Sequence, residues 1–229
     1  MAFSGLPKDY YDFFSELKEN NNRAWFEENK PRFKQSVQEP LVELVVAMAP
    51  RLKRVSKYFT ADPRLVGGSV FRIYRDVRFS KDKTPYKTFG AIHFRHARGK
   101  DAHAPGFYVH LDTDEVFFGG GIWVPPPPAL LKIREAIRED PAAWKKASTG
   151  KAFVARFGGV TGDGLTRPPR GFEHDDPYIE DIKRKSFFAI ANGTPSATRK
   201  GSFLDELEGT FRDTKPLMAF LCKALDAPF

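Results

Sequence analysis

The stretch between residues 66 and 124 constrains the fold most, because four strand candidates follow one another there with short links. In the first of them the apolar residues Phe71, Ile73 and Val77 alternate with polar ones, as in a half-buried strand. A parallel pair needs a crossover of about a dozen residues, which these links are too short to provide. The pattern therefore predicts an antiparallel meander. The candidates occupy residues 69–78, 89–95, 107–112 and 115–123.

Helical patterns flank this stretch on both sides. Before it, apolar residues recur at spacings of three and four, with Asn22 as a candidate N-cap. Asn29 followed by Pro31 predicts a helix restart, and Pro40 predicts a kink. After the prolines at 125–128 the helical pattern resumes, interrupted by one further strand candidate at residues 186–190.

These patterns predict one α+β domain over residues 1–229. Residues 1–60 are expected to be helical, 66–124 sheet-forming and 128–229 mostly helical. An antiparallel sheet of about four to six strands is expected to pack against the amino- and carboxy-terminal helices, mainly on one side.

Composition excludes several classes of protein. The chain holds no apolar run of the roughly 18 residues that a membrane span needs, and it begins without a secretory signal pattern. Cys222 is the single cysteine, so an internal disulfide and a cysteine-based zinc finger are excluded. We expect a cytoplasmic protein with no membrane partner. The sequence indicates no cofactor, assigns no metal and leaves the oligomeric state open.

Positive charge is concentrated in one part of the chain. The formal net charge is +8, and residues 72–100 hold nine basic residues against the two acids Asp76 and Asp82, which gives that stretch +7. Such a local excess favours an anionic partner. The nine are Arg72, Arg75, Arg78, Lys81, Lys83, Lys87, Arg95, Arg98 and Lys100.

Within this stretch we predict a clamp for a phosphate or carboxylate. Strand alternation would put Arg72, Tyr74, Asp76 and Arg78 on one face and Arg75 on the other, where it needs a buried partner. Arginine forks bind anionic oxygens in pairs and lysines add point charge. The same residues also suit a network of structural salt bridges. The predicted ligand-binding set is Arg72, Tyr74, Arg75, Asp76, Arg78, Lys83 and Lys87.

Several motifs occur in a fixed order along nearly the whole chain. They lie at residues 21–30, 72–88, 106–110, 119–121, 174–178 and 183–187. With these motifs the chain resembles a conserved-hypothetical family of bacteria and fungi that is catalogued as a domain of unknown function. The resemblance implies no activity, cofactor or substrate.

Histidines suggest acid–base chemistry as a further reading. His93, His96, His103 and His110 lie close in sequence, but strand alternation puts His93 and His96 on opposite faces. His93, His110 and Asp112 could share a face and serve as catalytic groups near neutral pH. A metal site at these residues is the less favoured reading.

Two alternatives from other classes stay open. A broad basic strip with Phe79, Tyr86 and Phe94 as base-stacking rings would make a nucleic-acid-binding module. A protein-interaction scaffold would dock through residues 125–128, although a helix start explains these prolines equally well.

Other notable residues are expected to be structural. The glycines at 119–121 predict a bulge or bend, since no phosphate-loop motif surrounds them. Cys222 sits in an apolar helical setting and is expected to be a core thiol. The large aromatics Trp25, Phe26, Trp123 and Trp144 are expected in the core.

Overall fold

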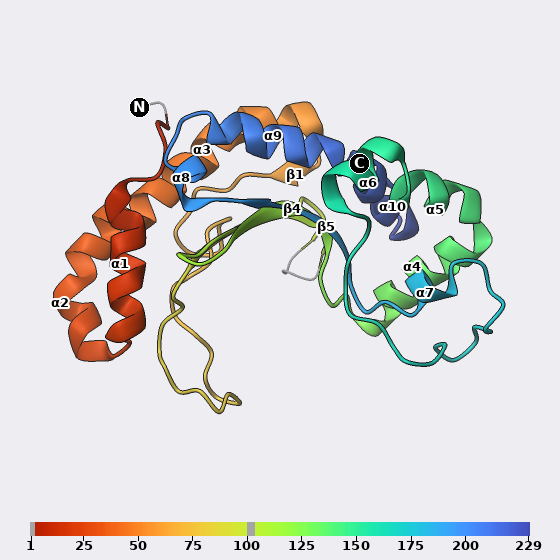
Figure 1. Ribbon diagram of the computed structural model, residues 1–229, viewed down its shortest axis with the longest axis horizontal. Helices are drawn as coiled ribbons and strands as arrows, with labels where there is room; N and C mark the ends of the chain where they lie inside the picture. Colours follow the sequence, from red (N-terminus) through yellow and green to blue (C-terminus); the bar gives the residue numbers. More distant parts are fainter. Residues whose placement is uncertain (1–2, 100–103) are drawn as a thin grey trace.

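The computed structural model describes residues 3–99 and 104–229. Within this part of the chain, five strands form one antiparallel sheet in the order β1-β2-β3-β4-β5 (Figure 1). The predicted α+β class and the antiparallel meander are confirmed. Lys100 and His103 lie outside the described residues. The strands are β1 (Phe59–Thr60), β2 (Gly90–His96), β3 (Gly106–Leu111), β4 (Val116–Ile122) and β5 (Phe187–Gly193).

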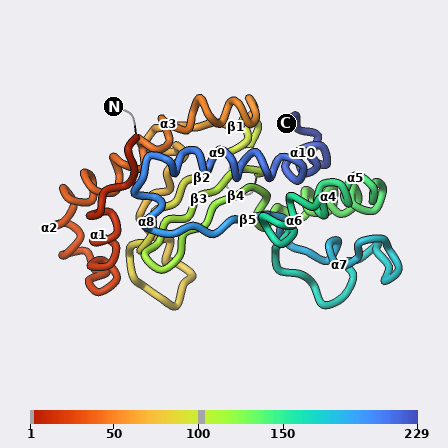
Figure 2. Tube along the Cα trace, turned by 45° about the horizontal axis from the view of Figure 1, so that its top comes forward, coloured from red at the N-terminus to blue at the C-terminus, as the bar shows by residue number. Residues whose placement is uncertain are grey.

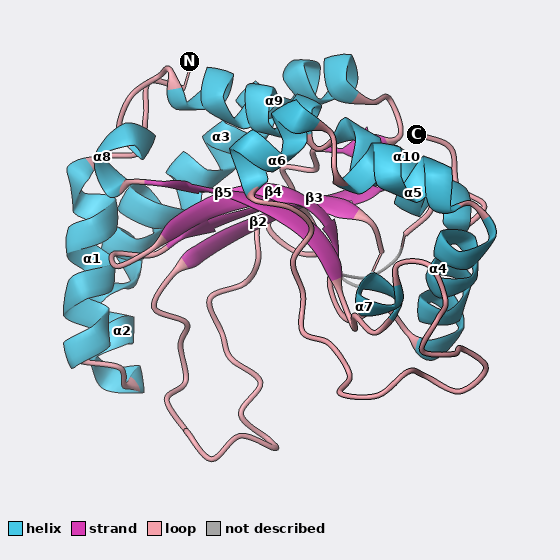
Figure 3. Ribbon diagram, turned by 45° about the vertical axis from the view of Figure 1, so that its right-hand side comes forward, coloured by secondary structure: helices cyan, strands magenta, loops and turns pink. Residues whose placement is uncertain are grey.

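Helices pack over one face of the sheet (Figure 3). Their aromatic side chains meet those of the strands: Phe211 stacks on Phe107 with ring centroids 4.7 Å apart, and Phe203 meets Phe118 edge-on at 5.5 Å. Burial of such rings is a main source of stability. The helices over this face are α3 (Glu39–Val55), α9 (Phe203–Asp213) and α10 (Lys215–Ala224).

The remaining helices lie toward the two ends of the sheet (Figures 1 and 2). The helices α1 and α2 lie at one end, and α4, α5 and α7 surround a second apolar cluster at the other, centred on the fully buried Trp144. Their bounds are α1 (Lys8–Glu19), α2 (Arg23–Phe33), α4 (Pro127–Glu139), α5 (Pro141–Ser148), α6 (Lys151–Phe157), α7 (Ile179–Ile182) and α8 (Pro195–Thr198).

The amino-terminal helices differ from prediction at Pro31. Asn22 caps α2 as expected, its side chain accepting from the Trp25 N–H at 3.0 Å. The predicted restart at Asn29 is wrong, because α2 runs on through Pro31. A π-helical segment (Lys34–Gln38) then leads into α3, at whose start Pro40 has no N–H to donate to the preceding turn.

Residues 69–78 do not form the predicted strand. The segment makes one bridge to β2, at Val70, and then pairs with its own return through a bridge between Tyr74 and Tyr86. Each of these bridges is isolated, so no continuous ladder of paired residues forms along the segment. Pro85 also has no backbone N–H to donate to such a ladder. Residues 72–88 instead form an arm that extends away from the sheet on the side opposite α3 and α9 (Figure 1).

The side chains of the arm still alternate in exposure, although the segment forms no strand. Arg72, Tyr74, Asp76 and Arg78 are exposed, as predicted for one face, whereas Arg75 is less exposed. The prediction that Arg75 has a buried partner is wrong. Its partner is Asp82, whose carboxylate is exposed.

The glycines at 119–121 lie inside β4 with an unbroken register, so the predicted bulge is wrong. Gly119 pairs with Tyr108 on one side and Ile190 on the other. A Cβ at Gly119 would lie 1.9 Å from the Ala189 carbonyl oxygen, and one at Gly120 would lie 2.8 Å from Thr214 Oγ1. These glycines therefore allow β5 and α10 to approach β4 closely.

The aromatic predictions hold for three of four residues. Phe26 and Trp144 are buried, and Trp25 packs against the core. Trp123 is 61% exposed, so its predicted core position is wrong. It directly follows Ile122, the last residue of β4. Among the described residues, every helix is too short or too polar to cross a bilayer.

Cys222 is fully buried in α10, as predicted for a core thiol. Burial raises the pKa of this thiol to about 12, so almost no thiolate forms at neutral pH. We expect Ellman's reagent to leave native Cys222 unreacted for hours and to modify it at once in guanidinium chloride. Rapid reaction of the native protein would contradict this placement.

Candidate functional site

The predicted clamp residues do not all meet at one place. Arg72 and Tyr74, at the base of the arm, line a cavity of about 980 Å³. Arg75, Arg78 and their acidic partners lie farther along the arm and do not line it. Asp82 binds Arg75 and Thr84, and Asp76 binds Arg78 at 2.7 Å.

The two predicted lysines bind backbone carbonyls of the arm. Lys83 Nζ donates to the Val77 carbonyl at 2.9 Å, and Lys87 Nζ donates to the Arg72 carbonyl at 3.0 Å. Lys87 also lies 5.1 Å from the centroid of the Phe71 ring. Burial, together with the charge of Arg72, lowers the pKa of Lys87. Lys87 therefore lies beside the cavity wall, while Lys83 lies toward the tip.

The cavity lies between the amino-terminal helices and the segment 65–74. Its apolar lining includes the buried side chains of Phe26, Val37, Leu41 and Ile73. Volumes up to about 1,000 Å³ are typical of small-molecule sites with mainly apolar walls. The charged and ionisable residues of the lining are Glu27, Lys30, Lys34, Arg72, Tyr74, His93 and Arg95.

Among the described residues of the lining, four cations thus face one carboxylate. Lys30 is 3.0 Å from Glu27, and Arg95 donates to the Gly67 carbonyl at 2.7 Å. Lys34 lies 4.0 Å from Glu39, outside the cavity lining. The excess makes the potential of the cavity positive and favours an anionic group there.

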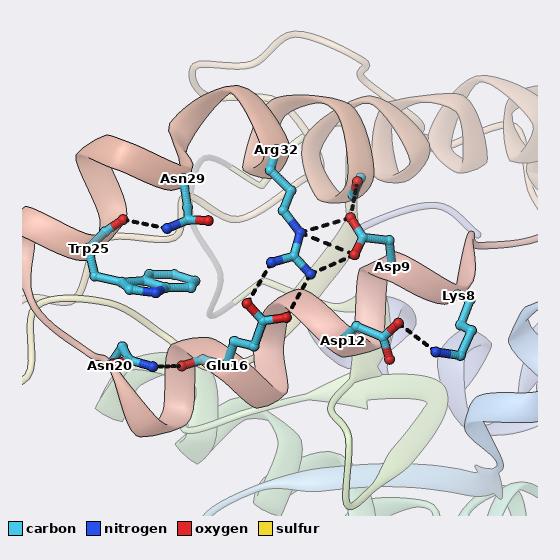
Figure 4. A network of polar contacts seen from close by, with 9 residues as sticks. Lys8, Asp9, Asp12, Glu16, Asn20, Trp25, Asn29 and Arg32 are labelled. Atoms are coloured by element: carbon cyan, nitrogen blue, oxygen red, sulfur yellow. Dashed lines mark hydrogen bonds and ion pairs between the residues drawn. The ribbon is translucent and has the colours of Figure 1, made fainter.

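The helices that form one wall of the cavity are held together by a network of ion pairs and hydrogen bonds. The Arg32 guanidinium lies between Asp9 and Glu16 of α1, at 2.6 Å from each (Figure 4). The Arg32 hydrogen bonds lower the pKa of Asp9, which also accepts from Ser36 in the π-helical segment at 2.6 Å. This network holds α2 and the π-helix against α1, and π-helical segments are frequent at functional sites.

The opposite wall is fixed at the base of the arm. Asn21 forms two hydrogen bonds with the backbone of Tyr86, donating to its carbonyl at 3.0 Å and accepting from its N–H at 3.1 Å. The Tyr86 ring stacks on Phe26 with centroids 4.1 Å apart. Both walls are therefore held by contacts within the protein, so the cavity is preorganised.

Among the predicted catalytic residues, His93 alone lines the cavity. It lies on β2, on the sheet face opposite the helices, and its ring stacks near Phe71 at 6.3 Å. His110 lies on the same face of β3, diagonal to His93, whose direct partner on β3 is Tyr108. Asp112 does not orient His110, because it binds Lys18 of α1 at 2.7 Å. The predicted trio therefore does not assemble around one point.

His110 has other partners. Its Nδ1 is 3.1 Å from the Tyr108 hydroxyl, its Nε2 is 3.6 Å from Glu115, and its ring stacks on Phe117 at 4.5 Å. Burial lowers the pKa of His110 below the ordinary 6.5, against the opposing charges of Glu115 and Asp112. The imidazole is therefore neutral at pH 7.

This lowered pKa predicts a loss of stability in mild acid. The unfolded chain takes up the proton near pH 6.5, whereas folded His110 takes it up only at lower pH. The urea midpoint should therefore fall as the pH drops from 6.5 toward the folded pKa. His110→Gln should reduce this dependence, while the exposed His174→Gln should retain it; equal slopes for wild type and His110→Gln would contradict the assignment.

In residues 3–99 and 104–229, no group of three or more His, Cys, Asp or Glu side chains is arranged to hold a metal ion. His93 and His96 lie three residues apart on β2 and so point to opposite faces, as predicted.

Sequence reasoning did not propose Lys30 and Lys34, which line the cavity. They lie one helical turn apart beside Glu27, a pattern typical of a solvated helix face. The sequence held one signal near them, Pro31 and Pro40 within an amphipathic stretch, although α2 continues through Pro31. Arg95 was counted among the basic residues but was not assigned to the site.

Comparison with known proteins places the chain in a family. Residues 9–220 match the model of the conserved hypothetical protein family DUF2461. No curated protein and no solved structure matches the chain. Since the match spans well over half of the residues, the protein belongs to the DUF2461 family of conserved hypothetical proteins.

Proposed function

We propose that the protein binds a small anionic ligand with an apolar or aromatic body in the cavity between α2 and segment 65–74. The proposal rests on one observation: in the part of the chain that the structure describes, four cationic side chains and a single carboxylate, Glu27, line this largely apolar cavity. A phosphate, sulfonate or carboxylate group would meet Arg72 and Lys34, and the body of the ligand would lie against Phe26 and Val37.

The proposal is one of binding, and the position of His93 supports an extension to turnover. A ligand held by Arg72 would lie in the same cavity as this imidazole. Acid–base work by His93 would need a ligand with an ionisable reacting group. His110 and Asp112 do not line the cavity, so they are not part of the proposed binding site.

The test uses a pair of fluorescent probes with the same type of body. The anionic probe is 8-anilinonaphthalene-1-sulfonate, and the neutral one is N-phenyl-1-naphthylamine. A charge-assisted contact contributes about 1.5–3 kcal/mol, so the anionic probe should bind at least about tenfold more tightly. Binding should saturate at one probe per chain and be displaced by 1-naphthyl phosphate.

Two results would contradict the proposal. Equal affinities for the two probes would show a cavity that selects apolar bodies without regard to charge. Failure of both probes to bind the native protein would show that the cavity is no binding site. Near-UV circular dichroism must remain native throughout, because partly unfolded proteins also bind the anionic probe.

Two of the three aromatic rings that were predicted to stack on nucleic-acid bases are buried. Phe94 is fully buried beneath the helices, and Tyr86 is 3% exposed. They point into the core because each packs on another ring, Phe94 against Phe211 and Tyr86 against Phe26. Of the three rings, Phe79 alone is exposed enough to stack on a base.

The prolines predicted to dock a partner protein lie at the start of α4, which begins at Pro127.

A further inference from the structure

The arm carries a fully exposed aromatic ring near its far end. The Phe79 side chain is 95% exposed, the highest value among the large hydrophobic residues of the described chain. Figure 1 shows the arm reaching away from the sheet and from α3 and α9. Burying such a ring is favourable, so its position in water is a cost that a partner would remove.

The exposed ring is held out by an ordered support. The Arg75 N–H donates to the Pro85 carbonyl at 2.9 Å, and the Lys87 N–H donates to the Ile73 carbonyl at 2.8 Å. Nearer the tip, Arg75 binds both Asp82 and Thr84. The arm therefore keeps its shape by its own contacts, and Phe79 is presented without the ordering cost of a flexible loop.

The acids of the arm are bound to local partners. Hydrogen bonds from Arg78 lower the pKa of Asp76 to about 2. The Thr84 N–H and then Arg75 lower the pKa of Asp82 to about 2. Both carboxylates therefore stay ionised and paired at neutral pH, and they leave the lysines of the tip uncompensated.

Lys81 and Lys83 carry this uncompensated charge. Among residues 3–99 and 104–229, neither lysine forms an ion pair with a carboxylate, and both side chains are exposed. They follow Phe79 by two and four residues, and Arg78 precedes it. The tip thus combines one exposed ring with cations on either side, in a chain of net charge +8.

We propose that the tip of the arm binds single-stranded nucleic acid. Phe79 stacks on an unpaired base, and Lys81 and Lys83 contact the neighbouring phosphates. Stacking on aromatic side chains combined with a cationic path is how proteins hold single strands without sequence preference. A membrane surface fits less well, because interfacial insertion needs a broad apolar face, whereas Ser80 and Asp82 flank the ring. This surface is separate from the cavity and does not depend on the cavity ligand.

The test is fluorescence anisotropy of labelled oligo(dT) and oligo(U) of 20 nucleotides with the full chain at low salt. Phe79→Ala should weaken binding about tenfold, as expected for one lost base stack. Lys81→Ala should weaken it less and should reduce the salt slope by about 0.7, the value for one phosphate contact on a single strand. The two oligonucleotides distinguish DNA from RNA as the bound strand.

Matched controls separate stacking from general stickiness and charge. Val46→Ala removes a half-exposed apolar side chain from α3, and Lys53→Ala removes an exposed lysine from the same helix. Both variants should bind as the wild type does. The proposal is overturned if neither oligonucleotide binds, if Phe79→Ala binds as tightly as Val46→Ala, or if Phe79 is needed for binding to anionic phosphatidylglycerol vesicles but not to oligonucleotides.

Discussion

Replacement of Gly119 by alanine is expected to destabilise the protein by about 3 kcal/mol or more. The added methyl group would lie 1.9 Å from the carbonyl oxygen of Ala189 in β5. That atom belongs to the backbone, so the strand pair itself would have to separate. In a chain of this size the expected loss lowers the melting temperature by about 6–12 °C.

Gly209→Ala is the matched control. Gly209 lies in α9, and the nearest atom to an added Cβ is the Arg212 side chain at 4.0 Å. Since glycine in a helix costs about 1 kcal/mol relative to alanine, this variant should be at least as stable as the wild type. A melting temperature for Gly119→Ala within about 2 °C of that of Gly209→Ala would contradict the close packing of β4 against β5.

Arg72→Gln is expected to weaken the anionic naphthalene probe about tenfold while leaving the neutral probe unchanged. The substitution removes the charge at the cavity wall and keeps a polar side chain of moderate length. Because the neutral probe meets only the apolar lining, its affinity should not respond. The measurement is a fluorescence titration of both probes with both proteins.

Arg78→Gln is the control that removes the same charge at a position outside the cavity. Arg78 belongs to the same arm, but its side chain is 76% exposed, binds Asp76 and lies outside the cavity. Its removal changes the net charge by the same amount as Arg72→Gln. If both variants weaken the anionic probe equally, the positive potential of the whole arm, and not Arg72 at the cavity, accounts for binding.

The sheet could be predicted because its signals are local. The strands β2, β3 and β4 follow one another through links too short for parallel crossovers, so period and link length sufficed. The two-residue β1 is too short to show a period. Residues 69–78 have the alternation of a strand, but alternation does not say whether a partner strand continues alongside them.

The site could be predicted only in part, for a different reason. Arg72 and Tyr74, which line the cavity, were proposed because they lie in the most basic stretch of the sequence. Lys30 and Lys34 were missed because they come from a helix about 40 residues earlier, and a pattern along the chain does not show which helix covers the edge of the sheet. The partner of Asp112 was likewise set by tertiary packing, because Lys18 lies on α1.

The most direct test of the cavity as a binding site is an amide chemical-shift map of the labelled protein titrated with the anionic naphthalene probe. We predict that the perturbed amides cluster at Lys30, Lys34, residues 70–73 and His93, on both walls of the cavity. Perturbations confined to the tip of the arm around Phe79, or spread over the surface without a focus, would contradict the account.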